Sequence, residues 1–136
     1  MVRYSDVCSV YVDGKHEALR HKWIESERAQ RDLGESAIRQ WVRDHWNDYL
    51  RARWVEHIQG VRFWKELDRG DFGLLQREFR DDGVLLDRIL DRLKEGQENL
   101  DVIRWALDWN VEMSKVIEIL EALDINSRRL AHRFDD

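Results

Sequence analysis

The chain has 136 residues, the length of one ordinary domain; 43% are hydrophobic, 38% are charged and the net charge is −5. Proline is absent, which favours long helices, and the single cysteine, Cys8, cannot form an internal disulfide, so a disulfide-stapled scaffold is excluded. No stretch approaches the roughly 18 apolar residues of a membrane helix, and the N-terminus lacks an apolar signal core, so we expect a cytoplasmic protein.

The charge divides this single domain, residues 1–136, into three expected parts. Residues 1–14 form an N-terminal arm, and residues 15–80 form a Trp/Arg-rich helical part with 14 basic and 12 acidic residues. Residues 81–136, with 8 basic and 14 acidic residues, form an acidic helical hairpin and a terminal helix. Because a duplex-binding domain neutralises phosphates with a basic patch, we expect no useful affinity for nucleic acid.

The N-terminal arm contains the one strand-like stretch, residues 6–12 (DVCSVYV), which the turn signal Asp13-Gly14 follows. Since the pattern predicts no second strand, this stretch either pairs with its own copy in a dimer or forms an ordered coil.

Two long helices are predicted next, over residues 15–33 and 35–59, and Gly34 and Gly60 mark their ends. In the first helix, the inward positions are Leu19, Trp23 and Ile24. In the second, apolar and aromatic residues recur in steps of three and four, which is typical of one helical face. These residues are Ile38, Trp41, Val42, His45, Trp46, Tyr49, Leu50, Trp54, His57 and Ile58. Most such stripes are core or interface, so we expect Trp41, Tyr49 and Trp54 to lose most of their solvent exposure.

The rest of the chain is also predicted to be helical. Two short helices over residues 61–68 and 74–79 flank a turn, and another helix begins at Asp82-Gly83 and ends near Gly96. A long helix is expected over residues 99–123, with Asn99 as its N-cap. Its heptad seam consists of Val102, Ala106, Trp109, Met113, Val116, Leu120 and Leu123. With a short terminal helix over residues 125–134, the chain is predicted to be an all-α, compact helical domain of five to seven helices.

Residue patterns that support catalysis or metal binding are weak. His45 and His57 lie about 18 Å apart along one helix, too far for a single ion. Glu17, His21 and Glu25 are spaced so that two of them can supply ligands, but no Glu-x-x-His of a di-iron bundle occurs. Nucleophile elbows, phosphate loops and dinucleotide fingerprints are absent too. We therefore expect no enzyme activity, no cofactor and no metal. A carrier of a small molecule or a metal is the third alternative function, behind an interaction module and a DNA-binding regulator.

The chain end offers one alternative function. Residues 115–134, KVIEILEALDINSRRLAHRF, resemble the terminal helix-turn-helix of the Fis-like family of bacterial DNA-binding proteins, most closely from Ile125 onward. The resemblance implies a DNA-binding regulator, with base or phosphate contacts from Asn126, Arg128, Arg129, His132 and Arg133. Asp124 stands where the family's turn has glycine, and Asp135 and Asp136 add negative charge beside the expected groove.

The first expectation is a non-enzymatic protein-interaction or regulatory module. It self-associates, as a dimer or larger homo-oligomer, through the heptad seam or through the Trp/Arg-rich stripe. Trp and Arg are the residue types most enriched at interaction hot spots. The expected interaction surface comprises Trp41, His45, Tyr49, Arg53, Trp54, His57, Trp109 and Met113.

Overall fold

The computed structural model describes residues 7–125 and 130–132, and over these residues the chain is all-α, as predicted. Six α-helices are present among them: α1 (Val10–Ala29), α2 (Glu35–Gln59), α3 (Leu74–Glu78), α4 (Gly83–Lys94), α5 (Asn99–Asp108) and α6 (Met113–Leu123). A 3₁₀ turn, η2 (Arg80–Asp82), precedes α4, and β1 (Val7–Cys8) pairs in parallel with β2 (Phe63–Trp64). None of the described helices is both long and apolar enough to cross a membrane.

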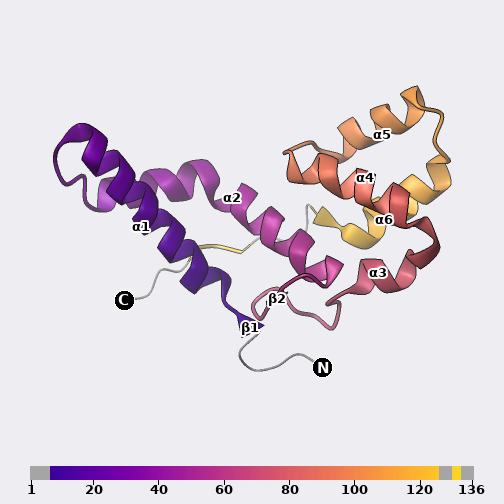
Figure 1. Ribbon diagram of the computed structural model, residues 1–136, viewed down its shortest axis with the longest axis horizontal. Helices are drawn as coiled ribbons and strands as arrows, with labels where there is room; N and C mark the ends of the chain where they lie inside the picture. The colour runs from indigo at the N-terminus through magenta and orange to yellow at the C-terminus, as the bar shows by residue number, and fades with distance from the viewer. Residues whose placement is uncertain (1–6, 126–129, 133–136) are drawn as a thin grey trace.

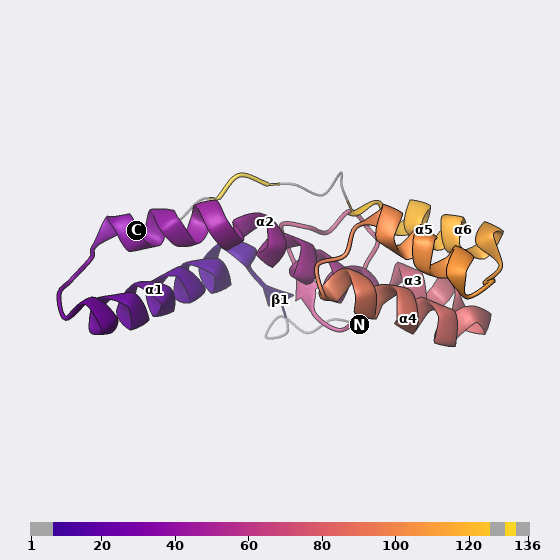
Figure 2. The same cartoon turned by 90° about the horizontal axis from the view of Figure 1, so that it is seen from above.

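Helix α2 connects two regions of the molecule (Figure 1). Its first half lies beside α1 in an antiparallel hairpin, and its second half runs toward α3, α4 and α6. Figure 2 shows from above that this α1–α2 hairpin extends to one side of the bundle formed by α3 to α6. The hairpin packs closely because small residues line its contact: Gly14, Ala18 and Ala37 are buried.

Buried indole groups join α2 to the rest of the chain. Nε1 of Trp54 donates to the carbonyl of Leu123 at 2.7 Å, and Nε1 of Trp46 donates to the carbonyl of Leu130 at 2.7 Å. Trp54 is fully buried among the leucines and isoleucines of the bundle. One continuous core therefore runs from the hairpin through the bundle.

The N-terminal region differs from the prediction. Helix α1 begins at Val10, inside the stretch expected as a strand, because the Ser9 hydroxyl accepts the N–H groups of Tyr11 and Val12 and caps it. The strand is confined to Val7–Cys8, and its partner is β2 of the same chain, where a helix over residues 61–68 was predicted.

The side chains expected to face inward in the first helix also differ from the prediction. Leu19, Trp23 and Ile24 are exposed by 39%, 65% and 37%, whereas Val10, Gly14 and Ala18 are buried. The predicted inward placement of these three side chains is therefore wrong. Helical periodicity could not show that the small residues on another side of α1 make the contact with α2.

The expected helix over residues 99–123 is two helices. After α5 the chain turns at Asn110, which has a left-handed φ of 53°, and Val111 N–H donates to the carbonyl of Ala106. The α5 N-cap is Glu98, in a capping box with Asp101, and Asn99 is the first helical residue. Five seam residues, Val102, Ala106, Val116, Leu120 and Leu123, are buried within this chain. The seam is therefore intramolecular packing.

At residues 130–132 the expected terminal helix is not present, whereas Ile125, its first expected residue, has a 3₁₀ conformation. Residues 130–132 have no helical assignment, and the Leu130 carbonyl instead accepts the hydrogen bond from Trp46 of α2. Asn126, Arg128, Arg129 and Arg133 lie outside the described residues. His132 is exposed, and its ring centre lies 6.3 Å from that of Trp46.

Candidate functional site

The expected stripe on α2 is largely core. Trp41, Tyr49 and Trp54 are exposed by 7%, 8% and 0%, which confirms their predicted burial. His57 is fully buried as well, so these four side chains do not form an outer surface. Of the other residues expected on the interaction surface, Arg53 and Met113 are half-buried, His45 is exposed, and Trp109 is 74% exposed at the far end of α5.

Aromatic rings stack where α2 meets α1. The ring centres of Trp46 and Tyr49 lie 5.5 Å apart, Trp41 packs edge-on against both, and Tyr11 of α1 stacks on Trp46 at 6.2 Å. Such geometry suits ring quadrupoles and adds stabilisation beyond the buried area. Trp41 and Trp46 of α2 are thus explained by packing at the contact between the two helices.

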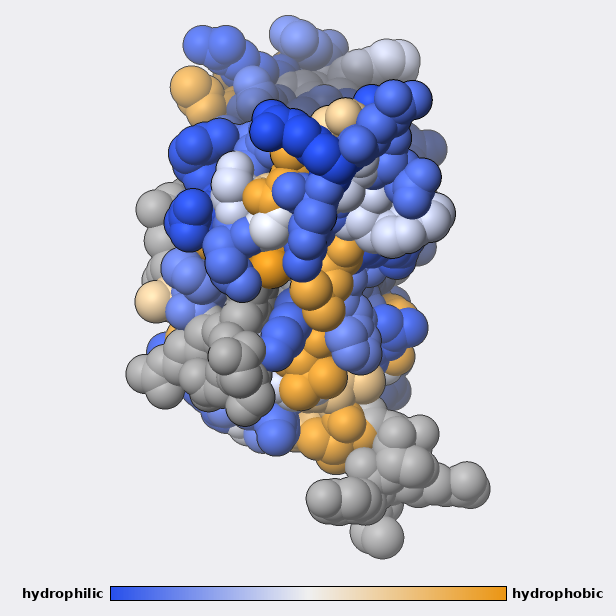
Figure 3. All heavy atoms as spheres, turned by 90° about the vertical axis from the view of Figure 1, so that its left-hand side faces the viewer, coloured by the Kyte–Doolittle hydropathy of each residue, from blue (hydrophilic) through white to orange (hydrophobic). Residues whose placement is uncertain are grey.

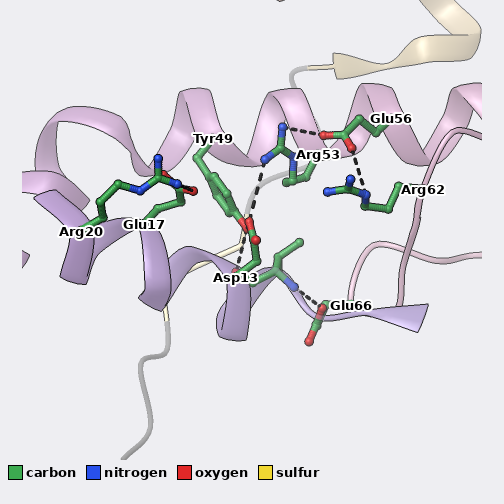
Figure 4. A network of polar contacts seen from close by, with 9 residues as sticks. Asp13, Glu17, Arg20, Tyr49, Arg53, Glu56, Arg62 and Glu66 are labelled. Atoms are coloured by element: carbon green, nitrogen blue, oxygen red, sulfur yellow. Dashed lines mark hydrogen bonds and ion pairs between the residues drawn. The ribbon is translucent and has the colours of Figure 1, made fainter. Parts of the chain in front are cut away.

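A network of polar contacts crosses the base of the hairpin (Figure 4). The Tyr49 hydroxyl donates to Oδ2 of Asp13 at 2.6 Å, and Arg53 lies over the Tyr49 ring at 5.1 Å. Arg53 forms an ion pair with Glu56, which also faces Arg62 at 3.8 Å. Burial, together with the hydrogen bond to Asp13, raises the pKa of Tyr49 far above its ordinary value. The hydroxyl therefore stays protonated and acts as a donor.

Glu66 anchors the start of α1. Its carboxylate accepts the backbone N–H of Val10 at 2.8 Å and the hydroxyl of Ser9, and Figure 4 shows it facing the first turn of the helix. A negative charge at a helix N-terminus is stabilising, since it offsets the partial positive charge of the unpaired N–H groups. Glu66 lies two residues after the end of β2, so one short segment holds both β1 and the first turn of α1.

His57 organises the loop between α2 and α3. Its Nδ1 accepts the N–H of Trp64 at 3.0 Å, and its Nε2 lies 3.3 Å from Asp68 Oδ1 and 3.5 Å from Asp71 Oδ1. Asp71 also accepts the N–H of Arg69, which closes the turn that the sequence Arg69-Gly70-Asp71 predicted. His57 therefore fastens β2 and the following turn to α2.

The same trio is the one group of three ligand atoms that the described residues place within 4.8 Å of one another. A ring nitrogen that accepts a hydrogen bond carries no proton. Because Nδ1 accepts from Trp64, the proton of neutral His57 lies on Nε2 and points at the two carboxylates. A metal at Nε2 would have to displace that proton, so hydrogen bonding accounts for this arrangement better than a metal.

The outer face of the hairpin presents apolar side chains to solvent. Leu19 and Trp23 lie on the wall of an open hollow of about 670 Å³, together with charged and polar residues of the same helix and the turn after it. Figure 3, in which the loop end of the α1–α2 hairpin faces the viewer, shows apolar residues gathered in a band between hydrophilic ones. A second hollow of about 420 Å³ lies on the α1–α2 groove. It is lined by Glu17, Arg20, His21, Ile24, Trp41, His45, Asp48 and Tyr49.

Sequence reasoning missed the exposed face of α1 and the partners of the polar network. Glu66 and Asp13 interact with residues far away in the chain, and no local pattern marks them. The i, i+3 and i, i+4 spacings were informative only within single helices.

Comparisons with protein-family models, with curated proteins and with solved structures find no match for this chain. Its function is therefore inferred from its own residues.

Proposed function

We propose that the protein is a non-enzymatic interaction module that self-associates through the outer face of its α1–α2 hairpin. The observation that carries the proposal is the exposure of Leu19 and Trp23, by 39% and 65%, on a helix of 20 residues that buries only Val10, Gly14 and Ala18. Large apolar side chains that gather on one exposed face, rimmed by polar residues, are typical of an interaction surface. Tryptophan in particular is enriched at interaction hot spots.

A second copy of the chain is the partner that the charges favour. The hairpin, residues 10–59, contains nine basic and nine acidic residues, so two hairpins can approach without net repulsion. Charged residues of both signs, including Lys22, Glu27 and Arg31, line the hollow beside Trp23. A two-fold interface places the same patch on both subunits and requires such self-complementarity. Two antiparallel hairpins joined along α1 would form a four-helix arrangement.

The polar network supports a structural role rather than a catalytic one. Tyr49, Asp13, Arg53 and Glu56 engage one another, so the polar groups of the network are held by hydrogen bonds and ion pairs within the chain. The strongly raised pKa of Tyr49 makes the hydroxyl a poor general base or nucleophile at neutral pH.

The experiment compares two exposed tryptophans. Trp23→Ser, alone and with Leu19→Ser, removes the α1 face, whereas Trp109→Ser removes a tryptophan of similar exposure from the other end of the molecule. In sedimentation velocity at micromolar concentration, we expect the α1 variants to shift toward the monomer and the Trp109 variant to behave like the parent chain. Equal sedimentation of all variants would contradict the proposed interface, and circular dichroism checks that each remains helical.

A further inference from the structure

His21 on α1 has a polar atom without a partner. Its Nε2 is buried, and none of the residues that the structure describes forms a hydrogen bond with it. An unsatisfied buried nitrogen costs free energy, and such groups in native proteins call for an explanation. Since His21 lies in the middle of α1 and faces the groove toward α2, the missing partner has to be reached from that groove.

A second imidazole lies across the groove. The ring centres of His21 and His45 are 6.2 Å apart, and both side chains line the hollow of about 420 Å³ between α1 and α2. Two imidazoles bound to one tetrahedral ion, at Zn–N distances of about 2.0–2.1 Å, have ring centres about 5 Å apart. Because His45 is exposed, rotation of its ring can close the remaining distance.

Two carboxylates that line the same hollow can supply further donors once side chains move, since no three ligand atoms of these residues lie within 4.8 Å of one another in the structure. Glu17 lies one turn before His21 on α1, Asp48 lies three residues after His45 on α2, and both line the same hollow. Glu17 is held in an ion pair with Arg20 at 2.9 Å, in which the arginine side chain is 66% exposed. An exposed ion pair of this kind contributes little free energy, so a metal ion can replace the arginine.

We propose that His21 and His45, with Glu17 and Asp48, form a binding site for a divalent transition metal of the zinc type. Imidazole nitrogens suit zinc, copper and nickel, and two histidines with carboxylates form a donor set that zinc accepts. The ion would cross-link α1 to α2 near the middle of the hairpin and supply His21 Nε2 with its partner. The site is independent of the proposed self-association, since Trp23 does not line this hollow.

The trio His57, Asp68 and Asp71 is a weaker candidate for the same ion, although its atoms are closer together. His57 is fully buried and its Nδ1 is engaged by Trp64, so binding there requires loss of the Nε2 proton from a closed site. His21 has no such competing bond. The two sites differ in the residues that have to be changed to remove them, which makes them separable by experiment.

The test uses the full chain with Cys8→Ser, which removes the one thiol as a competing ligand. Zn²⁺ is titrated by calorimetry and Co²⁺ by visible absorption, whose d–d bands report tetrahedral coordination. We expect one ion per chain, a rise in the melting temperature with metal, and at least about tenfold weaker affinity in His21→Ala and in His45→Ala.

Two variants serve as controls. His16→Ala changes another histidine of α1 and should leave the affinity unchanged, and Asp68→Asn disables the alternative trio. Circular dichroism without metal verifies that each variant folds. The proposal is overturned if the chain binds no Zn²⁺ tighter than about 100 μM, if His21→Ala/His45→Ala binds as well as its parent, or if Asp68→Asn alone abolishes binding.

Discussion

The indole N–H of Trp54 donates to the main-chain carbonyl of Leu123 at 2.7 Å, so the C-terminal part of α2 holds the last residue of α6. The final carbonyl groups of a helix have no partner within the helix itself. Trp54 supplies one from a buried position, and it also stacks on His57 at 6.0 Å. The side chain thus joins the bundle to the residue that organises the α2–α3 loop.

Truncation of Trp54 should be among the most destabilising single changes in the chain. Trp54→Ala creates a cavity in the core and is expected to lower the free energy of unfolding by about 3–5 kcal/mol. Trp54→Phe keeps most of the apolar volume but leaves the Leu123 carbonyl without its donor, which costs about 1–3 kcal/mol. Urea denaturation followed by circular dichroism measures both. Trp109→Ala, at an exposed position, should change stability by less than about 0.5 kcal/mol.

Substitution by alanine should change the free energy of unfolding in opposite directions at two glycines. Gly60 ends α2 with a φ of +80°, and a Cβ there would lie 3.1 Å from the Cα of Gly73, so Gly60→Ala should cost about 1–3 kcal/mol. Gly83 has a helical φ of −56° and open space around it, so Gly83→Ala should gain about 0.4–1 kcal/mol. Thermal unfolding of both variants provides the comparison. A stabilised Gly60→Ala chain would show that the α2–α3 loop does not approach the helix as described.

The hydrogen bond from the Trp64 amide to His57 Nδ1 should protect the Trp64 amide of β2 from hydrogen exchange. His57→Phe removes the acceptor and leaves a buried N–H unsatisfied, with an expected loss of about 1–3 kcal/mol. His57→Asn keeps an oxygen near the place of Nδ1 and should retain more of the stability. Hydrogen exchange at the Trp64 amide reports the bond directly. Equal protection in the two variants would mean that Nδ1 is not the acceptor.

Tyr49 predicts a loss of stability at alkaline pH. Its pKa is raised in the folded chain, chiefly by burial, whereas the unfolded chain has the ordinary value near 10. The contribution of Tyr49 to the free energy of unfolding is therefore fully present below pH 10. It is lost as the pH rises above 10, because Tyr49 ionises in the unfolded chain while it keeps its proton in the folded chain. Tyr49→Phe should reduce the slope of stability against pH between about pH 10 and 11, and Tyr11→Phe is the matched control. An unchanged slope in Tyr49→Phe would contradict the role of this hydroxyl.

Helix α2 was predictable to its bounds because Gly34 and Gly60 bracket an unbroken helical period. The division between α5 and α6 was not, since the apolar positions stay in phase across Asn110 and only its left-handed conformation reveals the turn. The pairing of β1 with β2 joins two-residue segments far apart in the sequence, and their own propensities do not specify it. Tertiary contacts decided both features.

Tertiary contacts also determine which residues form the candidate surfaces. Spacing alone placed Trp23 on a helix face with Leu19, but which side of α1 is covered depends on how closely Gly14 and Ala18 allow α2 to approach. The residues expected on the interaction surface were chosen for aromatic and arginine content, and burial of Trp41, Tyr49, Trp54 and His57 places four of them in the core. His21 and His45 lie on different helices, so only the hairpin brings them together.

Self-association of the chain can be measured by light scattering of the wild-type protein over a concentration series. The chain mass is 16.5 kDa. We predict a weight-average mass that rises toward about twice that value in the micromolar range, as expected for a two-fold interface. A mass that stays at 16.5 kDa at every concentration would contradict self-association, and the exposed face of α1 would then have no partner in a second copy.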